Sequence, residues 1–482
     1  MTSSSAPAGN NRFAFSSVTL LFFMWGFITC MNDLLIPKFK ADFQLSQMQA
    51  NMVQFAFFGA YFVVSFIYFL ISISSGDPIN KIGYKKGLVL GLAVAGIGCL
   101  LFYPAAQGKS YPLFLGALVI LGGGVTLIQI AANPFVSILG PEESAPSRLN
   151  LSQALNSLGY VIAPFIGGVL LFGKDVFNSA GGMNAVKVPY LGLGVAFIAL
   201  AIIFSFLRLP DFKQPEAVRS GASAFRHRHF VWGWLAIFFY VGSEVTVGSI
   251  LINYLADKGV MGLTEDQSAH FLSFYWGGVM IGRFMGAISL GDVAPSRKSL
   301  YMIISAVVGT LIIFGSATAK EHYTHGTFID PMTILPYVGL VALSFVFFLL
   351  GRSSPGRMVG LFALVAAALT VFSMSTHGEF ALWSIIGIGL FNSIMWSNIF
   401  TLSIRGLGAA KSQGSSLLVM MIVGGAVMPL IQGQLMDVYG VRYSLSVVLI
   451  GYAYLAYFGF FGSKNKQPLT EDEADKAMVA GH

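Results

Sequence analysis

The stretch WGFITCMNDLLIPKF, residues Trp25–Phe39, places a carboxylate, Asp33, inside a largely apolar segment. Two other formally charged side chains, Glu244 and Arg283, lie within long apolar segments. An ionisable residue at the centre of a bilayer costs about 2.5–3.5 kcal/mol on insertion scales, so such residues usually face a bundle interior or a watery cavity and mark an ion or substrate path. We therefore expect the functional site of the chain to lie near Asp33 and Glu244.

The composition is that of a membrane protein that crosses the bilayer many times. Of 482 residues, 55% are hydrophobic and 10% are charged, and the mean hydropathy is +0.74, whereas soluble domains carry about 25% charged residues. A helix of about 20 apolar residues crosses the hydrocarbon core, and we find fourteen such segments. They are 17–37, 50–73, 87–105, 113–139, 150–173, 188–207, 231–256, 268–290, 299–317, 333–351, 358–376, 381–403, 413–436 and 443–462. The sequence predicts an all-α membrane fold.

The net charge of +7 is distributed in a way that argues against nucleic-acid binding. Lys and Arg alternate in density from one predicted loop to the next, and the richer loops lie on the same side of the membrane as the N-terminus. Because basic loops stay in the cytoplasm, this asymmetry predicts that both termini are cytoplasmic.

The segments divide into two halves. A basic connection separates six segments from eight, a pattern typical of transporters built from repeats. An extra helix pair inserted in the second half would preserve its sidedness. We predict a flexible tail at 1–16, a six-helix bundle at 17–207, a cytoplasmic linker at 208–230, a second bundle at 231–462 with an inserted pair at about 299–351, and a flexible tail at 463–482. We expect the linker's run Arg226–His229 to be solvated near lipid headgroups.

Enzyme chemistry has no support in the sequence. There is no HExxH, no pair of histidines at ligand spacing and no GxSxG in a plausible context. The two cysteines, Cys30 and Cys99, both lie in apolar segments, where a buried small hydrophobe is expected. We predict no enzyme activity and no cofactor, apart from a transported ion.

The loop Gly76–Lys86 resembles the cytoplasmic loop signature of the major facilitator superfamily, although Asn80 and Tyr84 stand where that pattern usually has Asp and Arg. The resemblance implies that basic residues such as Lys85 and Lys86 help to lock helices at the cytoplasmic face. It also implies two six-helix bundles, here with the additional helix pair.

Longer stretches are similar to one family of that superfamily, the fucose, galactose and glucose cation symporters. They are Trp25–Phe39, QIAANPF at Gln129–Phe135, RLNLSQALNSLG at Arg148–Gly159, YVGSE at Tyr240–Glu244, YWGGVMIGRFMG at Tyr275–Gly286, and GSS followed by IVGGAVMP at 414–429. The resemblance implies a cation-coupled importer of glucose or galactose in the bacterial inner membrane. A monomer is expected, with a hexose, a coupling cation and the lipid bilayer as its partners.

Residue roles follow from the resemblance. Asp33 matches an Asp that couples a cation to sugar movement, and Gln153 and Asn156 match polar residues of the sugar site. Gln129 stands where the fucose:proton symporter has Glu, so a second protonatable group of that mechanism is missing in the first half. This favours sodium over the proton, with a possible sodium site at Asp33 completed by Asn32. A proton-coupled symporter for fucose or N-acetylglucosamine and a non-transporting sugar receptor are the alternatives.

The spacing of the amides agrees with a sugar site. Gln129 and Asn133 are four residues apart, and Gln153, Asn156 and Tyr160 fall at i, i+3 and i+7, so each set shares one helix face. An amide offers donors and an acceptor to neighbouring hydroxyls without carrying charge.

In the second half we assign Glu244, Trp276, Asn392 and Trp396 to substrate binding, since an indole can stack on the apolar face of a pyranose. We assign Arg283 a structural, gating role. It is expected to snorkel or to pair near the cytoplasmic end of its helix.

Three prolines in the apolar segments, Pro134, Pro164 and Pro429, are expected to interrupt their helices beside a cavity.

Overall fold

The computed structural model describes residues 8–45, 47–172, 184–210, 223–326 and 328–464. Helices and turns account for these residues, and no strand occurs among them. Within the described ranges, thirteen helical stretches are long and apolar enough to cross a membrane. The 28-residue helix α7 (Ala145–Phe172) coincides with the remaining predicted segment, 150–173. The predicted all-α membrane fold is confirmed.

The first half consists of α1 (Ala8–Asp42), α2 (Gln47–Ser75), α4 (Tyr84–Leu100) extended by α5 (Phe102–Gln107), α6 (Tyr111–Ile138), α7, and α8 (Asn184–Phe206). A short helix, α3 (Pro78–Ile82), joins α2 to α4. The first helix begins earlier than predicted, because residues 8–16 of the expected tail are helical; residues 1–7 lie outside the described chain.

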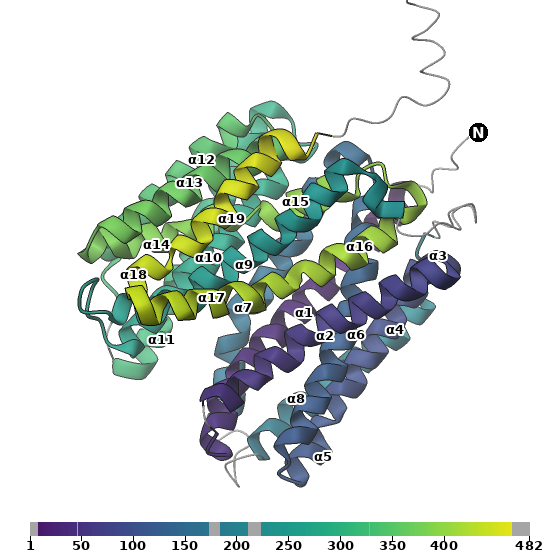
Figure 1. Ribbon diagram of the computed structural model, residues 1–482, viewed down its shortest axis with the longest axis horizontal. Helices are drawn as coiled ribbons and strands as arrows, with labels where there is room; N and C mark the ends of the chain where they lie inside the picture. The colour runs from purple at the N-terminus through teal and green to yellow at the C-terminus, as the bar shows by residue number, and fades with distance from the viewer. Residues whose placement is uncertain (1–7, 46, 173–183, 211–222, 327, 465–482) are drawn as a thin grey trace, which may run out of the picture.

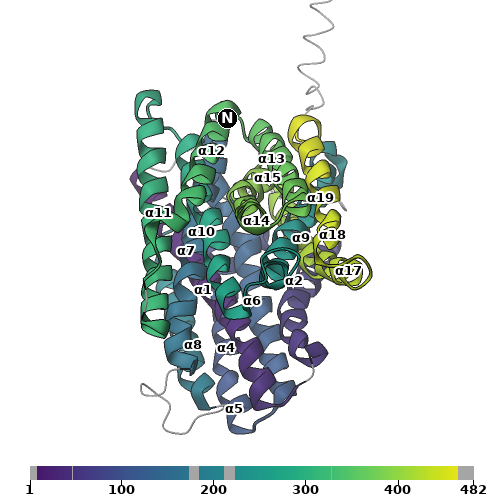
Figure 2. The same cartoon turned by 90° about the vertical axis from the view of Figure 1, so that its left-hand side faces the viewer.

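The second half contains α9 (Arg228–Ala256), α10 (Glu265–Ser289), α11 (Pro295–His325), α12 (Leu335–Gly351), α13 (Pro355–Ser375), α14 (Gly378–Asn392), α15 (Met395–Ile404), α16 (Lys411–Met420), α17 (Gly424–Tyr439), α18 (Val441–Ser444) and α19 (Ser446–Tyr457). Helices α11 and α12 correspond to the predicted inserted pair. They pack on α10, α13 and α14 at the edge of the bundle (Figure 2). Side chains such as Leu311 remain exposed there, as lipid contact requires.

The described part of the linker is more ordered than we expected. Its residues 211–222 lie outside the described chain, but a 3-10 turn (Ser223–Arg226) leads into α9. His229 is buried, and its Nε2 lies 2.9 Å from the carbonyl oxygen of Arg405. The prediction that the whole run Arg226–His229 is solvated is wrong for His229, because α9 begins within it and turns this side chain inward.

Two helix interruptions in the second half occur where the sequence shows no proline. Helices α6, α7 and α17 continue through Pro134, Pro164 and Pro429, contrary to our expectation. Instead, α14 and α15 are separated by a turn at residues 393–394, and α16 and α17 by a 3-10 turn, Met421–Val423. A break inside a membrane is tolerated where other groups satisfy the freed backbone.

Glycines allow the same close helix contact in both halves. In α1 and α7, a methyl group on Gly26 would lie 2.2 Å from the carbonyl oxygen of Asn156, and one on Gly159 would lie 2.5 Å from that of Phe23. In the second half, a methyl group on Gly424 would lie 2.1 Å from the carbonyl oxygen of Phe238 in α9. The pairs α1–α7 and α9–α17 are therefore equivalent in packing, which supports two related halves.

The two halves converge at one end and diverge at the other (Figure 1). We call the end that contains α3 and the start of α16 the closed end, and the end that contains α5 and α18 the open end. At the closed end, Asn80 donates to the carbonyl oxygen of Ala409 at 2.7 Å, and Asn150 donates to Asn398 at 3.1 Å. Among the described residues, no hydrogen bond joins the halves at the open end. This arrangement leaves the open ends free to approach each other.

We predict that Gly159→Ala destabilises the protein although alanine favours helices over glycine by about 1 kcal/mol. The new methyl group would meet the α1 backbone at 2.5 and 2.8 Å, which forces the helices apart. Thermal unfolding of detergent-purified protein measures the effect. Gly116→Ala is the matched control, since no atom lies within 4 Å of its added methyl group. Equal melting temperatures for the two variants would contradict the packing argument.

Candidate functional site: a cavity between the two halves

A cavity of about 150 Å³ lies between the halves, with walls from α1, α2, α6 and α7 on one side and α9, α10 and α15 on the other. This volume holds several water molecules at about 30 Å³ each. Most of the predicted site residues line it; they are Gln129, Gln153, Asn156, Glu244, Trp276, Arg283 and Trp396. Residues distant in sequence thus meet where a transport site is expected.

The wall from the first half is neutral and polar. Gln129, Gln153 and Asn156 are all buried and face the cavity from α6 and α7. Asn156 donates to the carbonyl oxygen of Phe22 at 3.0 Å, a bond that the close approach of α1 and α7 permits. Asn133, predicted to join this set, lies behind it and donates to the backbone of Gln129 at 3.0 Å. The helix-face prediction therefore holds for α7 and only in part for α6.

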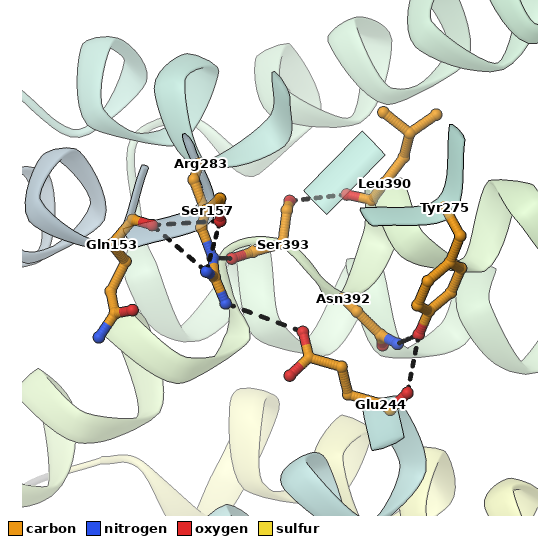
Figure 3. A network of polar contacts seen from close by, with 8 residues as sticks. All are labelled: Gln153, Ser157, Glu244, Tyr275, Arg283, Leu390, Asn392 and Ser393. Carbon is orange, nitrogen blue, oxygen red and sulfur yellow. Dashed lines mark hydrogen bonds and ion pairs between the residues drawn. The ribbon is translucent and has the colours of Figure 1, made fainter. Parts of the chain in front are cut away.

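The wall from the second half carries the charges. The Nη2 atom of Arg283 lies 3.8 Å from Oε1 of Glu244, and both side chains are buried (Figure 3). Arg283 also donates from Nε to the carbonyl oxygen of Ser393 at 3.2 Å. That carbonyl lies at the break between α14 and α15, so the guanidinium satisfies a backbone group that the break releases.

Arg283 also donates hydrogen bonds to the first half. Its Nη1 donates to Oγ of Ser157 at 2.6 Å and to the carbonyl oxygen of Gln153 at 3.3 Å. Of the two alternatives expected for Arg283, snorkelling or pairing near the cytoplasmic face, the structure shows pairing, but inside the protein, where the side chain finds a carboxylate and three other acceptors. It lines the cavity and joins α7 to α10.

Two tryptophans lie where a ligand could reach them. Trp276 stacks on Tyr160 of the first half, with ring centroids 5.8 Å apart and planes inclined by 26°. Trp396 lines the cavity from α15, and its indole Nε1 is buried without a hydrogen-bond partner among the described residues. The hydroxyl of Tyr240 and Oε1 of Glu244 also lack such partners. Buried polar groups normally have partners, so this cluster is suited to a polar ligand.

Asp33 lies one helical turn from the cavity. Its Oδ1 accepts a hydrogen bond of 2.7 Å from Nε2 of Gln54 in α2, and Thr29, four residues earlier on the same face, lines the cavity. The acid is thus inside the bundle, neighbouring the site rather than in its wall.

Asn32 points elsewhere. Its Oδ1 accepts from the hydroxyl of Tyr190 in α8 at 2.9 Å. Neighbouring residues on a helix are about 100° apart, so Asn32 and Asp33 cannot share one face. The structure therefore does not bring together the two oxygens that we expected to share a sodium ion.

Asn392 lies behind the second wall. Its Nδ2 lies 3.2 Å from the hydroxyl of Tyr275, which in turn donates to the carbonyl oxygen of Glu244 at 3.0 Å (Figure 3). This chain of contacts positions the backbone of α9 at Glu244, so Asn392 supports the site without facing the cavity.

The loop Gly76–Lys86 connects the halves, but not through its lysines. Lys85 and Lys86 lie at the start of α4, with Lys86 exposed. Asn80 and Tyr84, the residues that depart from the loop signature, make the contacts to Ala409 and to Ser412, the latter at 3.3 Å. Burial raises the pKa of the Asp77 carboxyl, which accepts from the hydroxyl of Tyr68 and from the amides that begin α3.

Sequence reasoning missed several cavity residues. Thr29 and Tyr240 each lie four residues before a charged residue that we did identify, Asp33 and Glu244 respectively, and both line the cavity. Helical spacing could have found them. Tyr61 of α2 gave no such signal, since aromatic residues make up 14% of the chain.

The sequence profile of the Major Facilitator Superfamily matches residues 14–351. The chain belongs to this superfamily and is a membrane transporter rather than an enzyme. Transporters of this class need no cofactor. The multi-pass location in a bacterial inner membrane that the sequence predicts is confirmed.

Two relatives are similar over nearly the whole chain. The glucose/galactose transporter of Brucella abortus is 43% identical over 460 residues, which cover 95% of each chain. The L-fucose-proton symporter of Escherichia coli is 29% identical over 460 residues, which cover 90% of each chain. A crystal structure of the fucose:proton symporter in the outward conformation matches with a TM-score of 0.72 and 26% identity, covering 94% of this chain and 99% of that one.

Proposed function

We propose that the protein is a cation-coupled hexose symporter that imports glucose or galactose by alternating access. The observation that carries this proposal is the cavity itself. It combines amides, a carboxylate and indoles from both halves. Hydrogen bonds join the described halves at Arg283 in the cavity wall and at the closed end. Both relatives described above are named as sugar transporters, which supports the substrate class.

The chemistry of the walls suits a neutral sugar. Gln129, Gln153 and Asn156 offer amide donors and acceptors. Glu244 and Tyr240 add oxygen atoms with free hydrogen-bonding capacity, and Trp276 or Trp396 can cover the apolar face of a pyranose. All these residues belong to one chain, so the proposed transporting unit is a monomer.

The direction of transport follows from the predicted topology. If basic loops stay in the cytoplasm, the closed end faces the cytoplasm and the halves diverge towards the periplasm (Figure 1). Substrate would enter from the periplasm, and rocking of the halves would then open the closed end. The resemblance to a fucose:proton symporter in its outward conformation supports this orientation.

Asp33 is the proposed coupling residue. It is a carboxylate inside the bundle, beside the cavity, with an amide as its neighbour and no Lys or Arg paired with it among the described residues. One charge moving through 100 mV contributes about 2.3 kcal/mol, which corresponds to roughly 40-fold accumulation of sugar. We propose sodium as the cation because Gln129 supplies no second protonatable group in the first half. Besides Asp33, the oxygen ligands of the sodium ion would come from groups other than Asn32.

We predict that Asp33→Asn abolishes concentrative uptake of labelled glucose into proteoliposomes while exchange of internal for external glucose continues. The amide keeps the shape of the side chain but cannot carry the charge that binds the cation. Separately imposed sodium and proton gradients identify the ion. Undiminished accumulation by the variant would contradict the coupling role, and drive by protons without any sodium effect would remove the sodium proposal.

We predict that Gln153→Ala weakens glucose binding by about 5- to 150-fold, since a lost buried hydrogen bond typically costs about 1–3 kcal/mol. Calorimetric titration of purified protein measures the affinity. Gln432→Ala is the matched control, because Gln432 is equally buried but bonds to Ser444 away from the cavity. Unchanged affinity in the Gln153 variant, or an equal loss in both, would count against this sugar site.

A further inference from the structure

The two buried acids occupy equivalent helices but have opposite electrostatic surroundings. Helix α1 carries Asp33 and packs on α7 through glycine, as α9 carries Glu244 and packs on α17 through glycine. Asp33 has a neutral amide as its hydrogen-bond partner, whereas Glu244 faces the guanidinium of Arg283 at 3.8 Å. One acid is therefore open to a mobile cation, and the other already has a fixed one.

Arg283 is anchored independently of Glu244. Its Nε and Nη1 atoms are committed to Ser393, Ser157 and Gln153, which leaves Nη2 directed at the carboxylate (Figure 3). Arginine suits this role because its charge is permanent and its donors form a rigid fork. Oε1 of Glu244, by contrast, has no hydrogen-bond partner among the described residues, and the Glu244 side chain is 10% exposed. The cation is fixed and the acid retains capacity for a ligand.

We propose that Glu244 is a second cation site whose occupant is built into the chain as the guanidinium of Arg283. The proposal rests on the proposed symport and deepens it. The tethered charge neutralises Glu244 throughout the cycle, so only Asp33 takes an ion from solution and one cation accompanies each hexose. Glu244 remains ionised and available to sugar hydroxyls.

The surroundings of Glu244 would accept a mobile cation if Arg283 lost its charge. Among the described residues, the other titratable side chains that face it are phenols, Tyr240 on α9, Tyr275 on α10, Tyr160 on α7 and Tyr452 on α19. None of these supplies a positive charge. A buried carboxylate without a partner is strongly unfavourable, so the site would bind sodium or a proton, and the hydroxyl of Tyr240 lines the same cavity.

The test changes the number of charges that move with each sugar. Proteoliposomes are loaded to a tenfold glucose gradient with no cation gradient, and the membrane potential that stops net flux is measured. One charge per sugar balances a tenfold ratio at about 59 mV and two charges at about 30 mV. We expect about 59 mV for the natural protein and about 30 mV for Arg283→Gln. A balance near 59 mV in the variant would overturn the proposal.

A second measurement needs no transport and no sugar, so it remains informative if Arg283→Gln is inactive or if hexoses are not the substrate. Thermal unfolding of purified protein is followed against sodium at constant ionic strength and against pH, because a ligand that binds only the folded state stabilises it. Arg283→Gln should gain stabilisation by sodium or by protons relative to Glu244→Gln/Arg283→Gln. Identical responses of these two variants in both titrations would refute the proposal.

Discussion

A buried charge in a membrane must be compensated, and the contacts of Arg283 show how this chain meets that constraint. The guanidinium neutralises Glu244, satisfies a carbonyl released by the break between α14 and α15, and reaches the first half through Ser157. Together these partners offset the cost of an arginine at this depth, which would be high without them. The cavity, the helix break and the junction of the halves therefore form one arrangement.

The same constraint separates the roles of the two halves. The first half supplies neutral amides and an acid without a fixed counter-charge, while the second supplies an ion pair and the indoles. Glycine contacts between α1 and α7, and between α9 and α17, hold both acids on comparable rigid supports. Since hydrogen bonds between the described halves are concentrated at the closed end and at Arg283, rocking can proceed without unfolding either bundle.

Much of this could be predicted from the sequence, because hydropathy identifies membrane helices and rare charges identify the cavity. Contacts between distant segments could not. Arg283 and Gln153 are 130 residues apart, and their pairing depends on how α7 packs against α10. No proline in the sequence marks the helix break at residues 393–394. The carbonyl oxygen that the break releases, that of Ser393, accepts a hydrogen bond from Arg283, which is distant in sequence. Helical geometry already argues against a sodium site shared by Asn32 and Asp33, because adjacent helical residues point in different directions.

The distance between the open ends of the halves tests the central claim that they rock around a shared site. Spin labels on Met52→Cys in α2 and Tyr439→Cys in α17 occupy exposed positions, while the natural Cys30 and Cys99 are buried. Pulsed electron resonance should show a shorter distance when glucose and the coupling cation are both present, and a longer distance for labels on Lys86→Cys and Arg405→Cys at the closed end. Distances that stay the same under every combination of sugar and cation would contradict the account.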